Sequence, residues 1–197
     1  MTLTRVSIAA AGVAVLALLV IGLAQLHGSS SAPARPLRLS LAQMRAQLAG
    51  SPGPLSALHA QAGELLPGGL AGVQARLTGL HGQAVVVNKW ASWCVPCHSE
   101  LGAFQRVSLA LGHRVAFIGI DSGESRRADG LGYLRSFPLS YPSYYDQSGE
   151  AGQAITDSSF TPVTVFYDRR GGQYIHQGPY PSEAKLEQDV KRYALGA

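Results

Sequence analysis

The residues best suited to chemistry are two cysteines near the middle of the chain. Cys94 and Cys97 are the only cysteines among the 197 residues, and two residues separate them. A pair with this spacing can exchange a disulfide with another protein, because one thiolate attacks and the second thiol then resolves the mixed disulfide. Two cysteines are too few for a structural disulfide framework, so the pair indicates redox, metal or haem chemistry, or an incidental spacing.

The segments on either side of the cysteines predict a strand that turns into a helix. Residues 84–90 form an apolar, β-branched run, and residues 99–111 carry apolar side chains at helical spacing. The first amides of a helix lack intrahelical partners and carry partial positive charge, which favours a thiolate. Cys94 is therefore the expected exposed nucleophile and Cys97 the resolving thiol. Pro96 falls in the first helical turn, where its missing amide hydrogen costs least.

The remaining pattern predicts an α/β domain with a central mixed sheet flanked by helices. Further strands are expected over residues 114–121, 163–167 and 173–177, the last of them antiparallel, with a short extended segment at 141–146. Helices are expected over residues 41–49, 55–66, 70–80, 125–137 and 181–195, with one or two turns at 151–155 and with Ser40 and Ser182 as N-caps.

The N-terminal part of the chain carries a targeting signal. Residues 6–24 form an uncharged apolar run of 19 residues, close to the roughly 20 that span a bilayer core. Residues 1–27 are either an uncleaved signal anchor, which would be a transmembrane helix, or a cleaved signal peptide; the length of the run favours the anchor. Both interpretations place the remainder outside the cytoplasm. Residues 28–54 are expected to be a linker with a short helix, and residues 55–197 the folded domain.

The charge of the chain does not indicate nucleic-acid binding. The formal net charge is +4 at pH 7, but the basic residues are scattered and no basic run interleaves with aromatic residues.

The second half of the chain resembles a known family. Residues 84–195 resemble the thioredoxin superfamily and, within it, the TlpA/ResA-like membrane-anchored thiol–disulfide oxidoreductases. The segments that carry the resemblance are residues 86–97 with the later Glu100, and residues 141–146, 161–164 and 166–171. The resemblance implies a thioredoxin-like fold and a protein thiol–disulfide oxidoreductase that needs no metal or cofactor.

The resemblance also implies roles for individual residues. It places Pro162 at the cis-proline of the superfamily, beside the sulfurs, with Thr161 offering backbone groups to a client peptide. It implies that Glu100 is the acidic residue linked to thiol protonation; a solvated helix charge is the alternative. Trp93, next to the nucleophile, and Pro96 are expected to contact clients.

Several positions depart from the pattern of the family or qualify it. Asn88 falls where cytosolic thioredoxins carry a buried aspartate. Lys89 falls where many relatives have an apolar residue, so if it lies near the sheet interior it needs a partner or must extend its amine to water. Val95 replaces the Gly or Glu often found between the cysteines, which leaves the direction of electron flow open.

The expected function is therefore an extracytoplasmic, membrane-tethered oxidoreductase that acts on client protein thiols and disulfides. A reductant of this kind must be recharged by a membrane electron-transfer protein. Relatives act on apocytochrome c thiols or on copper-site cysteines of oxidase subunits. An oxidant of folding extracytoplasmic proteins is the alternative.

Two non-enzymatic alternatives use the same cysteines. Residues 94–98 match the C-x-x-C-H pattern of c-type haem attachment, although the only methionines that could serve as axial ligand are Met1 and Met44. A copper carrier would combine the two thiolates with a distant histidine such as His176, since thiolates suit Cu(I).

Overall fold

The computed structural model describes residues 35–197. The predicted anchor or signal peptide at residues 1–27 lies outside the described residues. Within residues 35–197, no helix is both long and apolar enough to cross a membrane.

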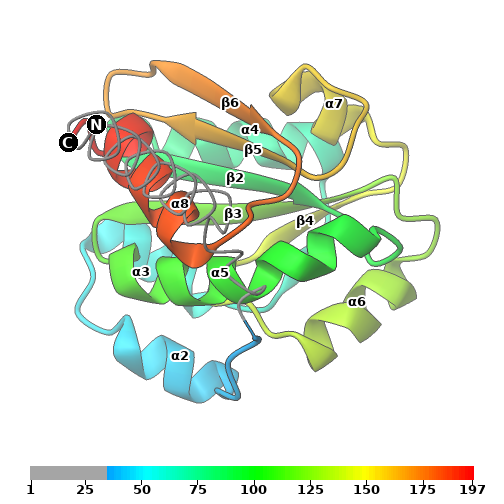
Figure 1. Cartoon of the computed structure of the whole chain (residues 1–197), viewed down its shortest axis with the longest axis horizontal. Coiled ribbons are helices and arrows are strands. Elements are labelled where there is room, and N and C mark those ends of the chain that lie inside the picture. Colours follow the sequence, from blue (N-terminus) through cyan, green and yellow to red (C-terminus); the bar gives the residue numbers. More distant parts are fainter. Residues whose placement is uncertain (1–34) are drawn as a thin grey trace, which may run out of the picture. The chain divides into compact units, whose positions relative to one another are not determined.

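In the described part, strands form one mixed sheet with the order β1-β4-β3-β2-β5-β6 (Figure 1). The strands are β1 (Leu65–Leu66), β2 (Ala84–Trp90), β3 (Val115–Ser122), β4 (Ser143–Asp146), β5 (Val163–Tyr167) and β6 (Gln173–Gln177). The first four run parallel to their neighbours, while β5 is antiparallel to β2 and β6 is antiparallel to β5. The predicted mixed sheet is confirmed.

Helices cover both faces of this sheet. They are α2 (Leu41–Gln47), α3 (Gly53–Ala60), α4 (Gly69–Gly79), α5 (Val95–Leu111), α6 (Arg127–Ser136), α7 (Glu150–Thr156), α8 (Glu183–Asp189) and the π-helical turn η1 (Val190–Ala194). Figure 1 shows α5 and α8 on one face and α4 and α7 on the other. Every residue of β2 and β3 is buried, because central strands that are covered on both faces have no solvent-facing side.

The core has two layers, one on each face of the sheet. Val86, Trp90 and Phe117 pack with Phe104 of α5 and Leu186 of α8 in the first layer. The side chains that alternate with them along the strands pack against α3, α4 and α7 in the second layer, among them Val85, Val87, Ile118 and Ile120.

Two predicted helices end differently in the structure. The helix predicted over residues 55–66 ends at Ala60, and Leu65–Leu66 instead form β1, which pairs with β4. Gly63 takes a left-handed conformation, with φ of 75°, and its amide donates to Tyr141 O, so the chain turns there and joins the sheet. The C-terminal helix begins after Ser182, as predicted, but its last part is the π-helical turn η1.

The segment before residue 55 contacts the domain. The amide of Leu37 donates to Gln105 Oε1 on α5 at 2.8 Å, and Arg45 of α2 donates to Ala62 O at 3.0 Å. The predicted cap of this helix is confirmed, since Ser40 and Gln43 form a capping box. The predicted domain boundary at residue 55 stays a prediction, but contacts do cross it.

Gly119 of β3 has no side chain, and this leaves room for the hydrogen bond between Trp90 and Ser143. Trp90 Nε1 donates to Ser143 Oγ at 3.1 Å, and a Cβ at position 119 would clash with that oxygen and lie 2.8 Å from Nε1. We expect Gly119→Ala to lower the free energy of unfolding by about 1–3 kcal/mol through overpacking. Urea denaturation measures this. Gly79→Ala is the matched control, because a Cβ there meets open space; an equal loss in both variants would contradict the explanation.

Candidate active site

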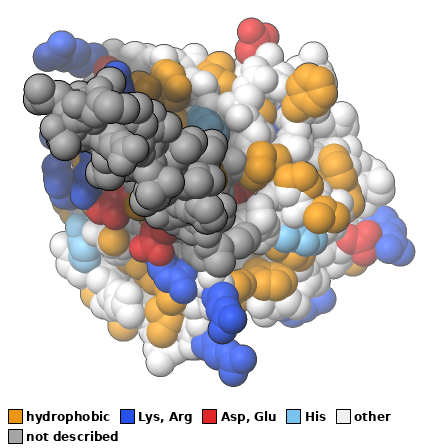
Figure 2. All heavy atoms as spheres, viewed as in Figure 1, with side chains coloured by type: hydrophobic (Ala, Val, Ile, Leu, Met, Phe, Trp, Pro, Cys, Tyr) orange, Lys and Arg blue, Asp and Glu red, His pale blue; other side chains and the backbone are white. Residues whose placement is uncertain are grey.

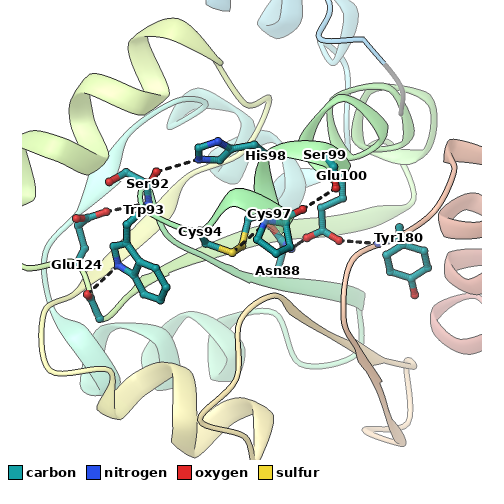
Figure 3. The surroundings of a disulfide bond; sticks show 12 residues. Asn88, Ser92, Trp93, Cys94, Cys97, His98, Ser99, Glu100, Glu124 and Tyr180 are labelled. Carbon is teal, nitrogen blue, oxygen red and sulfur yellow. Dashed lines mark hydrogen bonds between the residues drawn. A yellow bond between two sulfur atoms is a disulfide. The ribbon is translucent and has the colours of Figure 1, made fainter. Parts of the chain in front are cut away.

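The two cysteines lie where β2 leads into α5, as predicted. Cys94 is the N-cap residue of α5, and its Sγ accepts a hydrogen bond from the amide of Cys97 at 3.2 Å. The two sulfurs form a disulfide across the first helical turn, with the Cα atoms 5.3 Å apart (Figure 3). This pair of thiols can therefore bond to each other without rearrangement of the helix.

The disulfide is more buried than the sequence predicted. Cys94 was expected to be exposed, but it is only 2% exposed, and Cys97 is fully buried. Both belong to the core layer on the α5 side of the sheet. The neighbouring Trp93 and Val95 are exposed instead, by 58% and 75%.

Glu100 lies one turn after Cys97 on the same helix and is fully buried. Its carboxyl oxygens accept hydrogen bonds from Asn88 Nδ2 and from the amide of Tyr180, both at 2.9 Å (Figure 3). Burial raises the pKa of Glu100 to about 8, although these two hydrogen bonds act in the opposite direction. The interpretation of Glu100 as a solvated helix charge is therefore wrong.

Asn88 connects Glu100 to the central strand. It points to the α5 face of β2, between Val86 and Trp90, which both belong to the core layer on that face. Its amide nitrogen binds Glu100, while its Oδ1 is buried without a hydrogen-bond partner among the described residues. The position that falls where thioredoxins carry a buried aspartate is thus occupied by a neutral asparagine. Its side chain donates a hydrogen bond to the buried acid Glu100.

On the other side of the disulfide, hydrogen bonds fix the loop that carries Trp93. The indole Nε1 donates to Gly123 O at 3.0 Å, and the amide of Ser92 donates to Glu124 Oε2 at 2.9 Å (Figure 3). His98 is exposed, as expected; its Nε2 donates to Ser92 O at 2.9 Å, and its ring stacks on Tyr133. The loop is therefore held by hydrogen bonds between side chains and main-chain groups, while the Trp93 side chain stays more than half exposed.

The Thr161–Pro162 peptide bond is cis, as predicted. Val163, which follows this bond, pairs with Lys89 near the C-terminal end of β2. Thr161 and Pro162 therefore lie at the same end of the strands as the loop that leads to Cys94. Phe160 precedes them and is 74% exposed. The sequence motifs do not single out Phe160; the only signal for it is an aromatic residue directly before the Thr-Pro pair.

Lys89 has the partner that the sequence required. It is 2% exposed, and its Nζ donates to Ser158 O at 2.7 Å. Burial lowers the pKa of its amine, with the nearby Asp146 acting in the opposite direction. Because Ser158 lies three residues before Thr161, this contact ties the segment that carries the cis peptide bond to β2.

His176, the histidine of the copper-carrier alternative, lies on β6. Its ring stacks on Tyr180, with ring centroids 4.1 Å apart. Within residues 35–197, no group of three or more His, Cys, Asp or Glu side chains is arranged to hold a metal ion.

The C-x-x-C disulfide lies at the start of α5, directly after the central strand β2 of the mixed sheet. This arrangement defines a thiol–disulfide oxidoreductase of thioredoxin-like fold. No family model matches the sequence. The chain is 27% identical over 126 residues to the thioredoxin-like protein YneN of Bacillus subtilis, covering 61% of this chain and 73% of that protein. The chain is thus similar in sequence to a thioredoxin-like protein, and it shares the fold of a thioredoxin-family protein.

Solved structures share this fold. One is a thiol:disulfide interchange protein of the thioredoxin family from Chlorobium tepidum, with a TM-score of 0.51 and 24% identity over 59% of this chain and 83% of that one. Another is a secreted thiol-disulfide isomerase from Corynebacterium glutamicum, with a TM-score of 0.51 and 23% identity over 61% of this chain and 73% of that one.

Proposed function

We propose that the chain is an extracytoplasmic thiol–disulfide oxidoreductase that reduces disulfides in client proteins, with Cys94 as nucleophile and Cys97 as resolving thiol. The observation that carries this proposal is the Cys94–Cys97 disulfide at the start of α5, with the buried Glu100 one turn behind it. A carboxyl group whose pKa lies near the working pH is suited to move the proton of the resolving thiol.

The proposed exchange passes through a mixed disulfide between Cys94 and the client. The Cys94 thiolate attacks one sulfur of a client disulfide, and the other client sulfur leaves as a thiolate. Glu100 in its ionised form, which is populated near its pKa of about 8, accepts the proton of Cys97. Cys97 then attacks Cys94 Sγ and forms the Cys94–Cys97 disulfide. The client sulfur that was bonded to Cys94 leaves as a thiolate, with the electron pair of the broken bond. The client disulfide gains two electrons, and the two cysteines lose them.

The surroundings of Cys94 support the direction of this reaction. A strong oxidant of this fold is one whose reduced form is stabilised, as a thiolate held by positive charge. Among the described residues, Cys94 Sγ accepts one hydrogen bond, from the Cys97 amide, and Val95 and Pro96 add no charge. The helix N-terminus favours the thiolate, but no positively charged side chain hydrogen-bonds to Cys94 within residues 35–197. The reduced form is therefore stabilised less than in a strong oxidant, as in a reductant.

Exposed hydrophobic side chains form the surface on which clients would bind. Trp93, Val95 and Phe160 are the most exposed large apolar residues of the described part. Figure 2 shows hydrophobic side chains gathered on the side of the molecule where α5 begins. Backbone groups of Thr161, which is partly exposed, can pair with an extended client peptide. Pro96 is exposed next to Val95, whereas Pro162 is buried behind Thr161.

The proposed location and partners follow from the sequence and from the redox cycle. The apolar run at residues 6–24 supports a single-pass membrane anchor, and the related Corynebacterium glutamicum protein is a secreted one. Each turnover leaves the Cys94–Cys97 disulfide, so a membrane electron-transfer protein must supply two electrons. Apocytochrome c thiols and copper-site cysteines are the proposed client classes.

The reduction potential of the cysteine pair tests the proposed direction. Equilibration with thiol–disulfide buffers, followed by tryptophan fluorescence, is expected to place it near that of thioredoxin, about −270 mV. A potential near −120 mV, typical of a strong oxidant, would instead make the protein an oxidant of folding clients.

A further inference from the structure

Three polar side chains lie side by side across β2, β5 and β6. Asn88 is directly opposite Thr164, and Thr164 is directly opposite His176. Residues that are directly opposite in neighbouring strands present their side chains on the same face. These residues, which we call the polar row, therefore lead from the centre of the sheet to its β6 edge.

The polar row lies on the face that α5 and α8 cover. Phe166, two residues after Thr164, belongs to the core layer of that face, and Tyr174, two residues before His176, stacks on Tyr193 of η1. Asn88 and Thr164 are 1% and 0% exposed, while His176 is partly exposed. One end of the row is thus sealed beneath α5, and the other reaches the surface.

Each member of the polar row has a buried polar atom with no hydrogen-bond partner within residues 35–197. These atoms are Asn88 Oδ1, Thr164 Oγ1 and His176 Nε2. Buried polar atoms are nearly always satisfied by protein or by ordered water. Internal water needs donors and acceptors as partners. The polar row offers it the acceptor of Asn88, the hydroxyl of Thr164 and the ring nitrogen of His176.

Both ends of the polar row connect to Glu100. Asn88 Nδ2 donates directly to its carboxyl group, and the His176 ring stacks on Tyr180, whose amide donates to the same carboxyl group. The charged groups facing His176 are Asp189 and Lys185 of α8. Burial lowers the pKa of His176, with Asp189 opposing this and Lys185 reinforcing it, so its ring is neutral at pH 7 and can accept a proton.

We propose that the polar row holds internal water and is the path by which Glu100 exchanges its proton with solvent. This inference rests on the proposed function, in which Cys97 gives its proton to the Glu100 carboxylate. Glu100 then passes that proton to water bonded to Thr164 and Asn88, and the proton leaves through His176. Thr164 and His176 act through Glu100 and do not touch the reacting sulfurs.

Single-turnover kinetics of the full-length protein test the path. Thr164→Val removes the hydroxyl at nearly constant volume, and we expect it to slow formation of the Cys94–Cys97 disulfide from a mixed disulfide about tenfold at pH 7. Thr164→Ser, which keeps the hydroxyl, should retain the wild-type rate. His176→Phe keeps a ring against Tyr180 but removes the nitrogens, and should slow the same step. The reduction potential should be unchanged in all three variants.

A crystal structure of the wild-type protein provides the second measurement, with water expected within hydrogen-bond distance of both Asn88 Oδ1 and Thr164 Oγ1. A wild-type rate in Thr164→Val, or a dry site between these atoms, would overturn the path while leaving disulfide exchange intact. A wild-type protein without any exchange activity would overturn the proposed function, and the path with it.

Discussion

Cys94→Ser is expected to abolish catalysed disulfide exchange, leaving only the rate of free thiols in solution. The reason is that Cys94 is the N-cap of α5 and lies between the exposed Trp93 and Val95, whereas Cys97 lies within the first turn of the helix. A serine hydroxyl does not form a thiolate and cannot attack a disulfide. The measurement is the rate of reduction of a fluorescent client disulfide by the reduced protein.

Cys97→Ser should behave differently, because it leaves the nucleophile and removes the resolving thiol. It should accumulate a mixed disulfide between Cys94 and the client, visible as a mass increase that dithiothreitol reverses. Thr78→Ser on the exposed surface of α4 is the control and should retain the wild-type rate. If Cys97→Ser kept full exchange and Cys94→Ser formed the stable adduct, the two roles would be reversed.

The oxidised protein is expected to lose stability as the pH rises from 7 to 8. The pKa of Glu100 is raised from 4.5 to about 8 in the folded state, so the folded protein binds a proton that the unfolded chain has released. Linkage then requires the free energy of unfolding to fall as the pH rises between these values. The slope is at most about 1.4 kcal/mol per pH unit for each such group.

Asp121 contributes with the same sign. It is fully buried, both its carboxyl oxygens lack partners among the described residues, and burial beside Glu124 raises its pKa to about 8. Burial lowers the pKa of His59 and His176 below 6.5, which makes stability rise with pH, but this gain is nearly complete about one pH unit above 6.5. The lowered pKa of Lys89 acts in the same direction as the histidines, so the fall in stability towards pH 8 is attributed to the two carboxyl groups by the variants below.

Urea denaturation of the oxidised protein at several pH values between 6.5 and 8.5 measures this slope. Glu100→Gln should reduce the slope by up to the contribution of one group, and Asp121→Asn should reduce it by a similar amount. A stability that is constant or rises from pH 7 to 8 in the wild type would contradict the assignment. An unchanged slope in Glu100→Gln would remove Glu100 as its source.

The parts of the fold that could be predicted are those with local patterns. The buried strand before Cys94, the apolar spacing of α5 and the Ser40 and Ser182 caps depend on neighbouring residues, and they match the structure. Leu65–Leu66 could not be recognised as β1, because two leucines in a leucine-rich stretch have no strand period. Their strand conformation depends on pairing with β4.

The candidate site was only partly predictable for a similar reason. The cysteines, Glu100 and Pro162 were identified from motifs, but the environment of Glu100 comes from residues distant in sequence. Tyr180, 80 residues away, donates to Glu100 through its backbone amide. Because the donor is the backbone, the type of residue at position 180 gives no sign of this role. The burial of Cys94 likewise depends on how α5 packs on the sheet.

The two donors to Glu100 differ in how readily mutation can change them. The Tyr180 donor is a main-chain amide, so every residue except proline would supply it. The Asn88 donor is a side chain, and one substitution can remove it. Because that hydrogen bond lowers the pKa of Glu100, its loss would strengthen proton binding. In an evolving lineage, position 88 is thus where the acidity of Glu100 can be adjusted, while the contribution of position 180 is preserved.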